Sequence, residues 1–138
     1  MKTCYIIFLA AIIACFNVST IVLADDVNGL WTKTTSPDAD NITIFYNENN
    51  NLKAIGYSEI QGKKTVWYAE GKIEGKRLQC FYHHSQDALP PGWESEGIMK
   101  LILSDDGKVI SGTATSKSGK WSGKIEFKRI VLETPSVD

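Results

Sequence analysis

The sequence predicts an all-β protein, a single eight-stranded antiparallel up-and-down β-barrel. Residues 97–130 contain three strand-like runs separated by two glycine-containing turns. In the last run, every second residue is predicted to lie on one side of the strand, and polar residues stand between them. The residues on that side are Trp121, Gly123, Ile125, Phe127 and Arg129. The preceding chain repeats this rhythm of short β-branched and aromatic runs, and no segment has the period of an amphipathic helix. Closing such a sheet removes its exposed edges, whereas a two-sheet β-sandwich is the alternative architecture.

Residues 1–24 have the features of a signal peptide. Lys2 precedes a long apolar run, and Val22-Leu23-Ala24 provides a site that a signal peptidase recognises. We therefore expect a secreted or periplasmic protein, with a barrel domain at 25–132 and a loose tail at 133–138. A retained membrane anchor and a lipoprotein anchored through Cys15 are the alternatives, because Ile12-Ile13-Ala14-Cys15 resembles a lipobox.

Charge and cysteine content restrict the function classes. The chain of 138 residues has a formal net charge of −1, so electrostatics favours neither nucleic acid nor, after removal of the signal peptide, a membrane. Cys4 and Cys15 belong to the leader, which leaves Cys80 without a partner for an intramolecular disulfide. Export without disulfides favours a bacterial source.

The first three strands are expected at Gly29–Lys33, 41–46 and 52–59. Each run is rich in β-branched and aromatic residues. A turn cluster at 35–38 separates the first two strands, and an asparagine-rich loop at 47–51 separates the next two.

Strand four is expected at 65–73 and strand five at 77–83. Period two places four residues of strand four on one face, namely Trp67, Ala69, Gly71 and Ile73. The connection at 84–96 is the longest one expected between strands, and Pro90-Pro91-Gly92 stiffens it.

Gly29-Leu30-Trp31 on the first strand and Arg129 on the last resemble the calycin superfamily of lipocalins, fatty-acid-binding proteins and avidins. This resemblance implies that Trp31 closes one end of the barrel and that Arg129 packs over its ring as a cation–π pair. Parity independently places Arg129 on the inward side, because it alternates in register with Ile125 and Phe127.

The N-terminal third is similar to avidin in particular. The matching residues are Gly29, Trp31-Thr32, Asn41, Thr43-Ile44, Asn51-Leu52 and Gly56-Tyr57. The resemblance implies that Tyr57 contacts a ligand. In avidins the residue after Trp-Thr is usually an asparagine that holds the ureido oxygen of biotin, whereas this chain has Lys33, which argues against biotin.

The aromatic residues suggest a ligand site. An eight-stranded barrel has room for side chains and at most one small ligand, and aromatic walls suit a planar or apolar one. The candidate ligand-binding residues are Tyr57, Trp67, Tyr82, Trp93 and Trp121. We therefore expect an exported, non-enzymatic binding protein that holds a small, partly apolar ligand in the open end of the barrel. Core filling accounts for the same aromatics equally well.

The alternative function is a protein-interaction module, such as an inhibitor of a secreted enzyme, acting through the 85–96 loop. The contact residues would be Leu89, Pro90, Pro91 and Trp93, since a proline-stiffened apolar loop with a tryptophan anchor suits a protein partner. A barrel interior filled by Trp67, Phe127 and Met99 would favour this alternative over the cavity.

No residue cluster predicts catalysis, a metal site or a cofactor. His83-His84 lies near Glu94 and Glu96, but adjacent strand residues face opposite ways, so a solvated strand end is the preferred interpretation. Cys80 shares its parity with core residues and is interpreted as part of the wall. The sequence therefore predicts that the protein is not an enzyme.

Overall fold

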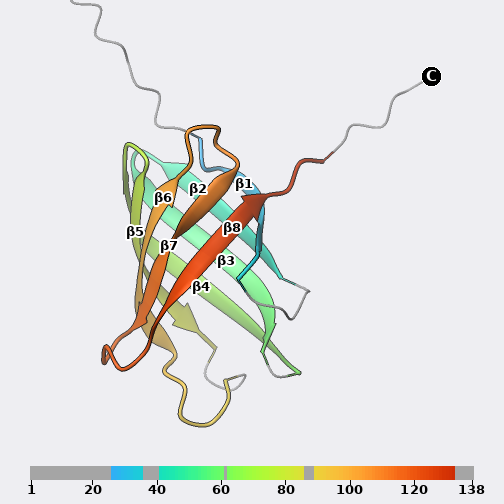
Figure 1. Cartoon of the computed structure of the whole chain (residues 1–138), viewed down its shortest axis with the longest axis vertical. Coiled ribbons are helices and arrows are strands. Elements are labelled where there is room, and N and C mark those ends of the chain that lie inside the picture. The colour runs from blue at the N-terminus through green and yellow to red at the C-terminus, as the bar shows by residue number, and fades with distance from the viewer. Residues whose placement is uncertain (1–25, 36–40, 61, 86–88, 133–138) are drawn as a thin grey trace, which may run out of the picture.

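The computed structural model describes residues 26–35, 41–60, 62–85 and 89–132 (Figure 1). They form β1 (Gly29–Lys33), β2 (Ile42–Glu48), β3 (Asn51–Ile60), β4 (Lys63–Glu74), β5 (Arg77–His84), β6 (Glu96–Leu103), β7 (Val109–Ser116) and β8 (Ser122–Arg129). Within these ranges, no helix is long and apolar enough to cross a membrane. The predicted signal peptide at 1–24 and tail at 133–138 lie outside the described residues.

The strands form one closed barrel in sequence order. Each strand is antiparallel to the next, and β8 returns to pair with β1 from Trp31↔Arg129 to Lys33↔Phe127. The predicted up-and-down barrel is therefore confirmed, and the two-sheet sandwich is excluded. Because closure pairs the first and last strands, neither of them leaves an open sheet edge.

Burial alternates along the strands with the period of two that the sequence predicts. On β4, Thr65, Trp67 and Ala69 are buried, whereas Val66 and Tyr68 between them are exposed. The register carries this alternation from strand to strand, so the buried positions face the barrel axis.

The predicted 47–51 loop is shorter in the structure. β2 and β3 run on until only Asn49 and Asn50 separate them, and both adopt positive φ angles of 52° and 63°. Asparagine tolerates this left-handed region better than most residues, and two such residues form the tight turn that suits the twist of a hairpin. The rest of the asparagine-rich segment therefore extends the two strands.

Aromatic rings fill the middle of the barrel. Trp31 meets Phe45 edge-on with ring centroids 6.0 Å apart, and Phe45 meets Phe127 in the same way at 5.2 Å. Trp67 continues the stack, with its ring 6.3 Å from that of Phe127. Met99 is also buried. The side chains of Trp67, Phe127 and Met99 thus all lie in the core. A barrel interior filled in this way was expected to favour a protein partner bound through the 85–96 loop over a ligand in the cavity.

The end of the barrel where the chain enters β1 is closed by Arg129. Its guanidinium carbon lies 4.5 Å from the centre of the Trp31 ring, which is the contact that the resemblance to calycins implies. The guanidinium also donates hydrogen bonds to the carbonyl oxygens of Gly107 and Asn28, both at 2.9 Å, and to that of Asp26. A planar group thus covers the tryptophan and satisfies three acceptors at once.

Candidate functional site

Polar side chains gather inside the other end of the barrel, which we call the loop end. Those on the inward-facing side of the strands are Lys33, Asn41, Ser58, Thr65, His84 and Ser116. At the opposite end, most inward side chains are apolar and buried: Leu52, Ile73, Leu78, Leu101, Leu103 and Ile110. The polar side chains at that end are Arg129 and Asn47, and the buried Oδ1 of Asn47 has no partner in the described structure. A polar group inside a barrel costs stability unless it is hydrogen-bonded, so the loop end is where function is to be sought.

Two aromatic side chains of the loop end lie over glycines on the neighbouring strand. Trp67 pairs with Gly56 across β4 and β3, and a Cβ at Gly56 would lie 2.2 Å from the indole. Tyr82 pairs with Gly97 across β5 and β6, and a Cβ there would lie 2.4 Å from the phenol oxygen. Each ring can therefore lie along the barrel wall in the space that a side chain would occupy.

Trp121 lies beside Gly123, a glycine two residues further along the chain, at the rim of the barrel. It precedes β8, is 55% exposed, and its ring would lie 2.7 Å from a Cβ at Gly123 on the inward-facing side. The sequence predicted Trp121 as part of the last strand's buried face, whereas β8 begins at Ser122. Its indole is exposed because the barrel wall ends there, so it borders the mouth.

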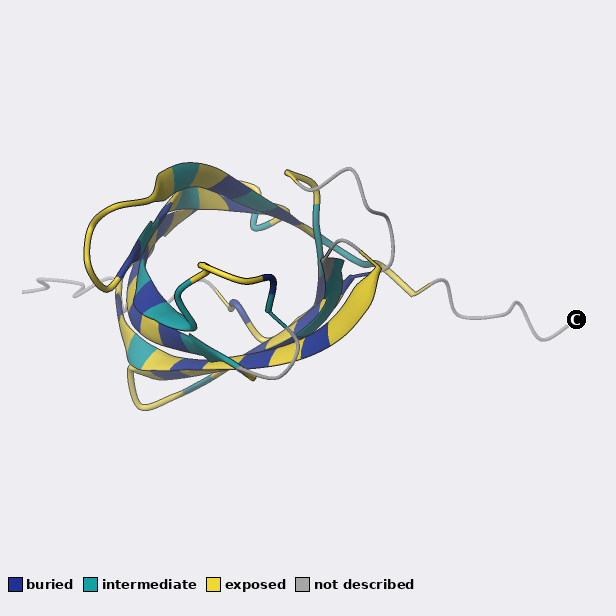
Figure 2. Cartoon of the chain, turned by 90° about the horizontal axis from the view of Figure 1, so that it is seen from below, coloured by how far each residue is buried: buried dark blue, intermediate teal, exposed yellow. Residues whose placement is uncertain are grey.

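The loop after β5 passes across the mouth of the loop end (Figure 2). In the described part of this loop, Pro90 is buried and Trp93 is 55% exposed. The backbone N–H of Trp93 donates to the Pro90 carbonyl at 3.2 Å, so the proline-containing stretch forms a turn. Glu94 fixes the loop to the β7–β8 turn by accepting hydrogen bonds from the backbone N–H and the hydroxyl of Ser118.

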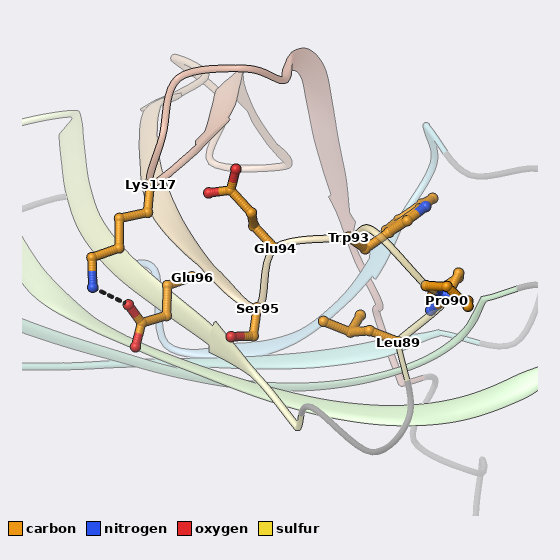
Figure 3. A pocket seen from close by; sticks show the side chains of 8 residues that line it. Leu89, Pro90, Trp93, Glu94, Ser95, Glu96 and Lys117 are labelled. Carbon is orange, nitrogen blue, oxygen red and sulfur yellow. Dashed lines mark hydrogen bonds and ion pairs between the residues drawn. The ribbon is translucent and has the colours of Figure 1, made fainter.

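A hollow of about 540 Å³ lies along this loop (Figure 3). Its lining comprises Leu89, Pro90, Pro91, Trp93, Glu94, Ser95, Glu96 and Lys117. The Lys117 ammonium lies 2.6 Å from a Glu96 carboxylate oxygen at one side of it. The hollow thus combines an apolar, proline-rich wall with a charged one.

The pKa values of three groups at the loop end are shifted from their ordinary values. Burial, the Lys33 charge and the His83 charge together lower the pKa of His84 to about 4. Burial also lowers the pKa of the Lys33 ammonium. Tyr82 is affected in the opposite sense, because burial and the nearby Glu94 carboxylate raise the pKa of its phenol. Perturbed titratable groups in a concave site are candidates for ligand contact.

The two histidines have separate environments, as strand parity predicts. His83 points outward, and its Nδ1 lies 3.3 Å from a Glu96 carboxylate oxygen. The preferred interpretation of a solvated strand end is wrong for His84. Its ring contacts the Trp67 and Tyr82 rings at 6.3 and 5.6 Å, and the Nδ1 atom is buried.

Cys80 lies in the barrel wall as predicted. It is buried, and that burial raises the pKa of its thiol to about 12, so the thiolate that a nucleophile requires is not formed at neutral pH. Among the residues that the structure describes, no group of three His, Cys, Asp or Glu side chains is placed to hold one metal ion.

The predicted ligand residues are therefore only partly brought together. Trp67, Tyr82 and Trp121 lie at the loop end, and Trp93 lies on the loop above it. Tyr57 was matched to the ligand-binding tyrosine of avidins, but it points away from the interior, because its cross-strand partners Ile42 and Val66 are both exposed. Gly56 occupies the inward position instead, since the Trp67 ring fills the space beside it.

Sequence reasoning missed the polar members of this end. Lys33 was considered only as a departure from avidin, His84 only as a possible metal ligand, and Thr65 not at all. All three share strand parity with a core residue, namely Lys33 with Trp31, His84 with Tyr82, and Thr65 with Trp67. That parity was the available signal for their position inside the barrel.

The outer surface carries a second feature, an apolar area over β2 to β6. Ile44, Ile55 and Tyr68 lie side by side across three strands and are all exposed. A hollow of about 370 Å³ continues from it, with Tyr68, Phe81 and Ile98 in its lining.

The chain matches no protein-family model, no curated protein and no solved structure at a significant level. The geometry above therefore carries the functional argument by itself.

Proposed function

We propose that this protein is a non-enzymatic binding protein that holds a small, partly apolar ligand at the loop end of the barrel. The observation that carries this proposal is the contrast between an apolar, filled end and an end with inward polar groups under a crossing loop. Polar atoms placed inside a barrel without partners are destabilising, and a ligand that completes their hydrogen bonds accounts for their presence.

The packing of the interior limits the size of the ligand. Phe127, Trp67 and Met99 occupy the middle of the barrel, so a ligand is restricted to the layer between them and the loop. The side chains of Tyr82 and Trp121 lie at this end, and aromatic rings suit a planar or apolar body. Such a layer accommodates a molecule with few atoms rather than an extended lipid chain.

We further propose that the chain is exported through residues 1–24 and is related to the calycins. The Gly29-Leu30-Trp31 motif, the Trp31–Arg129 contact and the up-and-down barrel support this relationship. Lys33 replaces the asparagine that the resemblance to avidin would require, so the proposed ligand is one other than biotin.

Native mass spectrometry of the protein, purified without denaturation after expression of the full-length sequence, tests the proposal. We expect a co-purifying small mass, or a thermal shift with members of a panel of hydrophobic metabolites. Trp121→Ala should reduce that shift, because the indole lies at the mouth. Tyr68→Ala is the matched control, since it removes an equally exposed aromatic from the outer face. No mass and no shift would contradict the proposal.

A protein partner is the second candidate function. The burial of Trp67, Phe127 and Met99 favours it, as does Trp93, which is exposed on a loop whose turn and Glu94–Ser118 contacts hold it in place. Preorganised loops with an aromatic anchor bind proteins at low entropic cost. Here Trp93→Ala should abolish capture of a secreted enzyme, while Trp121→Ala should leave it unchanged. The reverse order of effects would favour the small ligand.

A further inference from the structure

Lys33 reaches into the mouth of the barrel from one side. Its Cα pairs with that of Phe127, a core residue, and it shares the inward parity of Trp31. β1 and β5 are four strands apart in a closed ring of eight, so they lie on opposite sides of the barrel. Both residues nevertheless have inward parity at the loop end, and the Lys33 charge is one of the causes that lower the pKa of His84.

No carboxylate neutralises this ammonium among the described residues. The ion pairs found there join Lys76 to Asp105, and His83 and Lys117 to Glu96. A half-buried ammonium that has lost part of its hydration and gained no counter-charge is costly. Among the described residues, therefore, no side chain supplies a counter-charge to this ammonium.

Two buried hydrogen-bonding atoms at the loop end also lack a partner in the described structure. Thr65 is 1% exposed, and its hydroxyl has no partner in the described structure. The buried Nδ1 of His84 has none there either. Trp67 is the cross-strand partner of His84, and Thr65 lies two residues before Trp67 on the same strand. The Thr65 hydroxyl and the His84 Nδ1 therefore belong to neighbouring positions on the inner face of β4 and β5.

All three groups can donate hydrogen bonds. The ammonium has three donors, the hydroxyl has one, and the neutral imidazole has one on whichever nitrogen carries the proton. In the described part of the loop, the Glu94 carboxylate already accepts two hydrogen bonds from Ser118. Donors that converge beside a single positive charge suit an acceptor-rich anion.

We propose that the loop end binds the carboxylate group of its ligand between the Lys33 ammonium, the Thr65 hydroxyl and the His84 ring. This inference rests on the proposed function and specifies its ligand as a small carboxylic acid whose apolar body faces Tyr82 and Trp121. A singly charged carboxylate matches the single ammonium, and its two oxygens offer enough lone pairs for the three donors.

A matched pair of probes separates this inference from the proposed function. 1-Naphthoate and 1-naphthamide share one apolar body and differ in charge, so their affinities can be compared by calorimetry. We expect naphthoate to bind about tenfold more tightly, since hydrogen bonds to charged groups are the stronger ones. Lys33→Met should remove this preference. Lys124→Met, which removes an exposed ammonium from the outer face of β8, should keep it.

Acetate tests the anion site without any apolar body. In an NMR titration of the histidine rings at constant ionic strength, acetate but not chloride should raise the pKa of His84, because a bound anion stabilises the imidazolium. Lys33→Met should abolish the effect. Thr65→Val, which keeps the side-chain shape and loses the hydroxyl, should weaken it.

The outcomes are distinct. Equal affinity for naphthoate and naphthamide would overturn the carboxylate site and leave the proposed function standing. A response of His84 to acetate without binding of either naphthalene compound would support the anion site and contradict the apolar pocket. A lack of response to all three probes would overturn the inference, as would an increase in stability with acetate that persists in Lys33→Met.

Discussion

The closed end and the loop end of the barrel are built from the same eight strands but use their inward positions differently. At the closed end, leucine and isoleucine fill the interior, and Arg129 finds a ring and three carbonyl acceptors. At the loop end, Lys33, Thr65 and His84 face inward with hydrogen-bonding or charge requirements that the described residues leave unmet. The difference separates a part that stabilises the fold from the part at which we propose that a ligand binds.

The largest expected effect comes from truncating the apolar end. Leu101→Ala should lower the free energy of unfolding by about 2–5 kcal/mol, because it removes buried methyl groups opposite Leu78 and leaves a cavity. The matched change at the loop end, Ser58→Ala, should alter it by less than about 1 kcal/mol. Urea denaturation measures both. Equal losses would show that the two ends do not differ in their contribution to stability.

Arg129→Ala should have the next largest effect. It removes the ring contact with Trp31 and leaves three carbonyl oxygens without that donor, at a combined cost of about 2–4 kcal/mol. Arg129→Lys should recover only part of this, since an ammonium is not a planar fork.

A double-mutant cycle checks the origin of that loss. Trp31→Phe should cost less in the Arg129→Ala background than in the wild-type protein, as coupled residues require. Strictly additive losses would mean that the ring and the guanidinium do not stabilise each other.

Acid should destabilise the loop end through His84. Its folded-state pKa of about 4 lies below the ordinary value of 6.5, so the unfolded chain takes up a proton first as the pH falls. The stability that neutral His84 contributes is therefore complete above pH 6.5 and is lost progressively toward pH 4, by at most roughly 3 kcal/mol.

The matched variants are His84→Gln and His83→Gln. The first should flatten the stability profile between pH 6.5 and 5, above the range in which the carboxylates titrate. The second changes the outward histidine and should leave the slope in place. An unaltered slope in His84→Gln would show that its ring is hydrated in the folded protein.

The smallest predicted effect has the opposite sign. Thr65→Val keeps the shape of a buried side chain and removes a hydroxyl that has no partner in the described structure, so stability should rise by up to about 1 kcal/mol. Thermal unfolding of the free protein measures it. A loss of stability would reveal a hydrogen bond to the hydroxyl, through water or otherwise, in the free state.

The sequence predicted the fold through features that depend on local order. Period-two alternation on the strands, the glycine-containing turns and the inward parity of Arg129 are set by neighbouring residues, and the structure confirms each of them. The 47–51 loop was overestimated because composition indicates a turn without indicating how few residues form it. Asn49 and Asn50 suffice.

The candidate site was predicted less well because it depends on pairing between strands. Tyr57 was assigned by resemblance, but the register makes Gly56 the inward residue by placing the Trp67 ring beside it. Lys33 and His84 lie far apart in the sequence, and only closure of the barrel places both side chains at the same end of one interior. When the role of a residue depends on a partner from the other side of the barrel, the sequence around that residue does not indicate the role.

The closing contact also affects when the fold can form. β1 has only five residues, and Arg129 bonds to Asn28 across 101 positions of sequence. The pairing of β1 with β8 cannot form until almost the whole chain has been synthesised and, if the chain is exported, translocated. Until then β1, which is already able to pair with β2, has an unpaired edge on its other side, and an open strand edge is the kind of surface that associates with other chains. Closure is therefore expected late in folding, and β1 should be the first strand to exchange its amide protons.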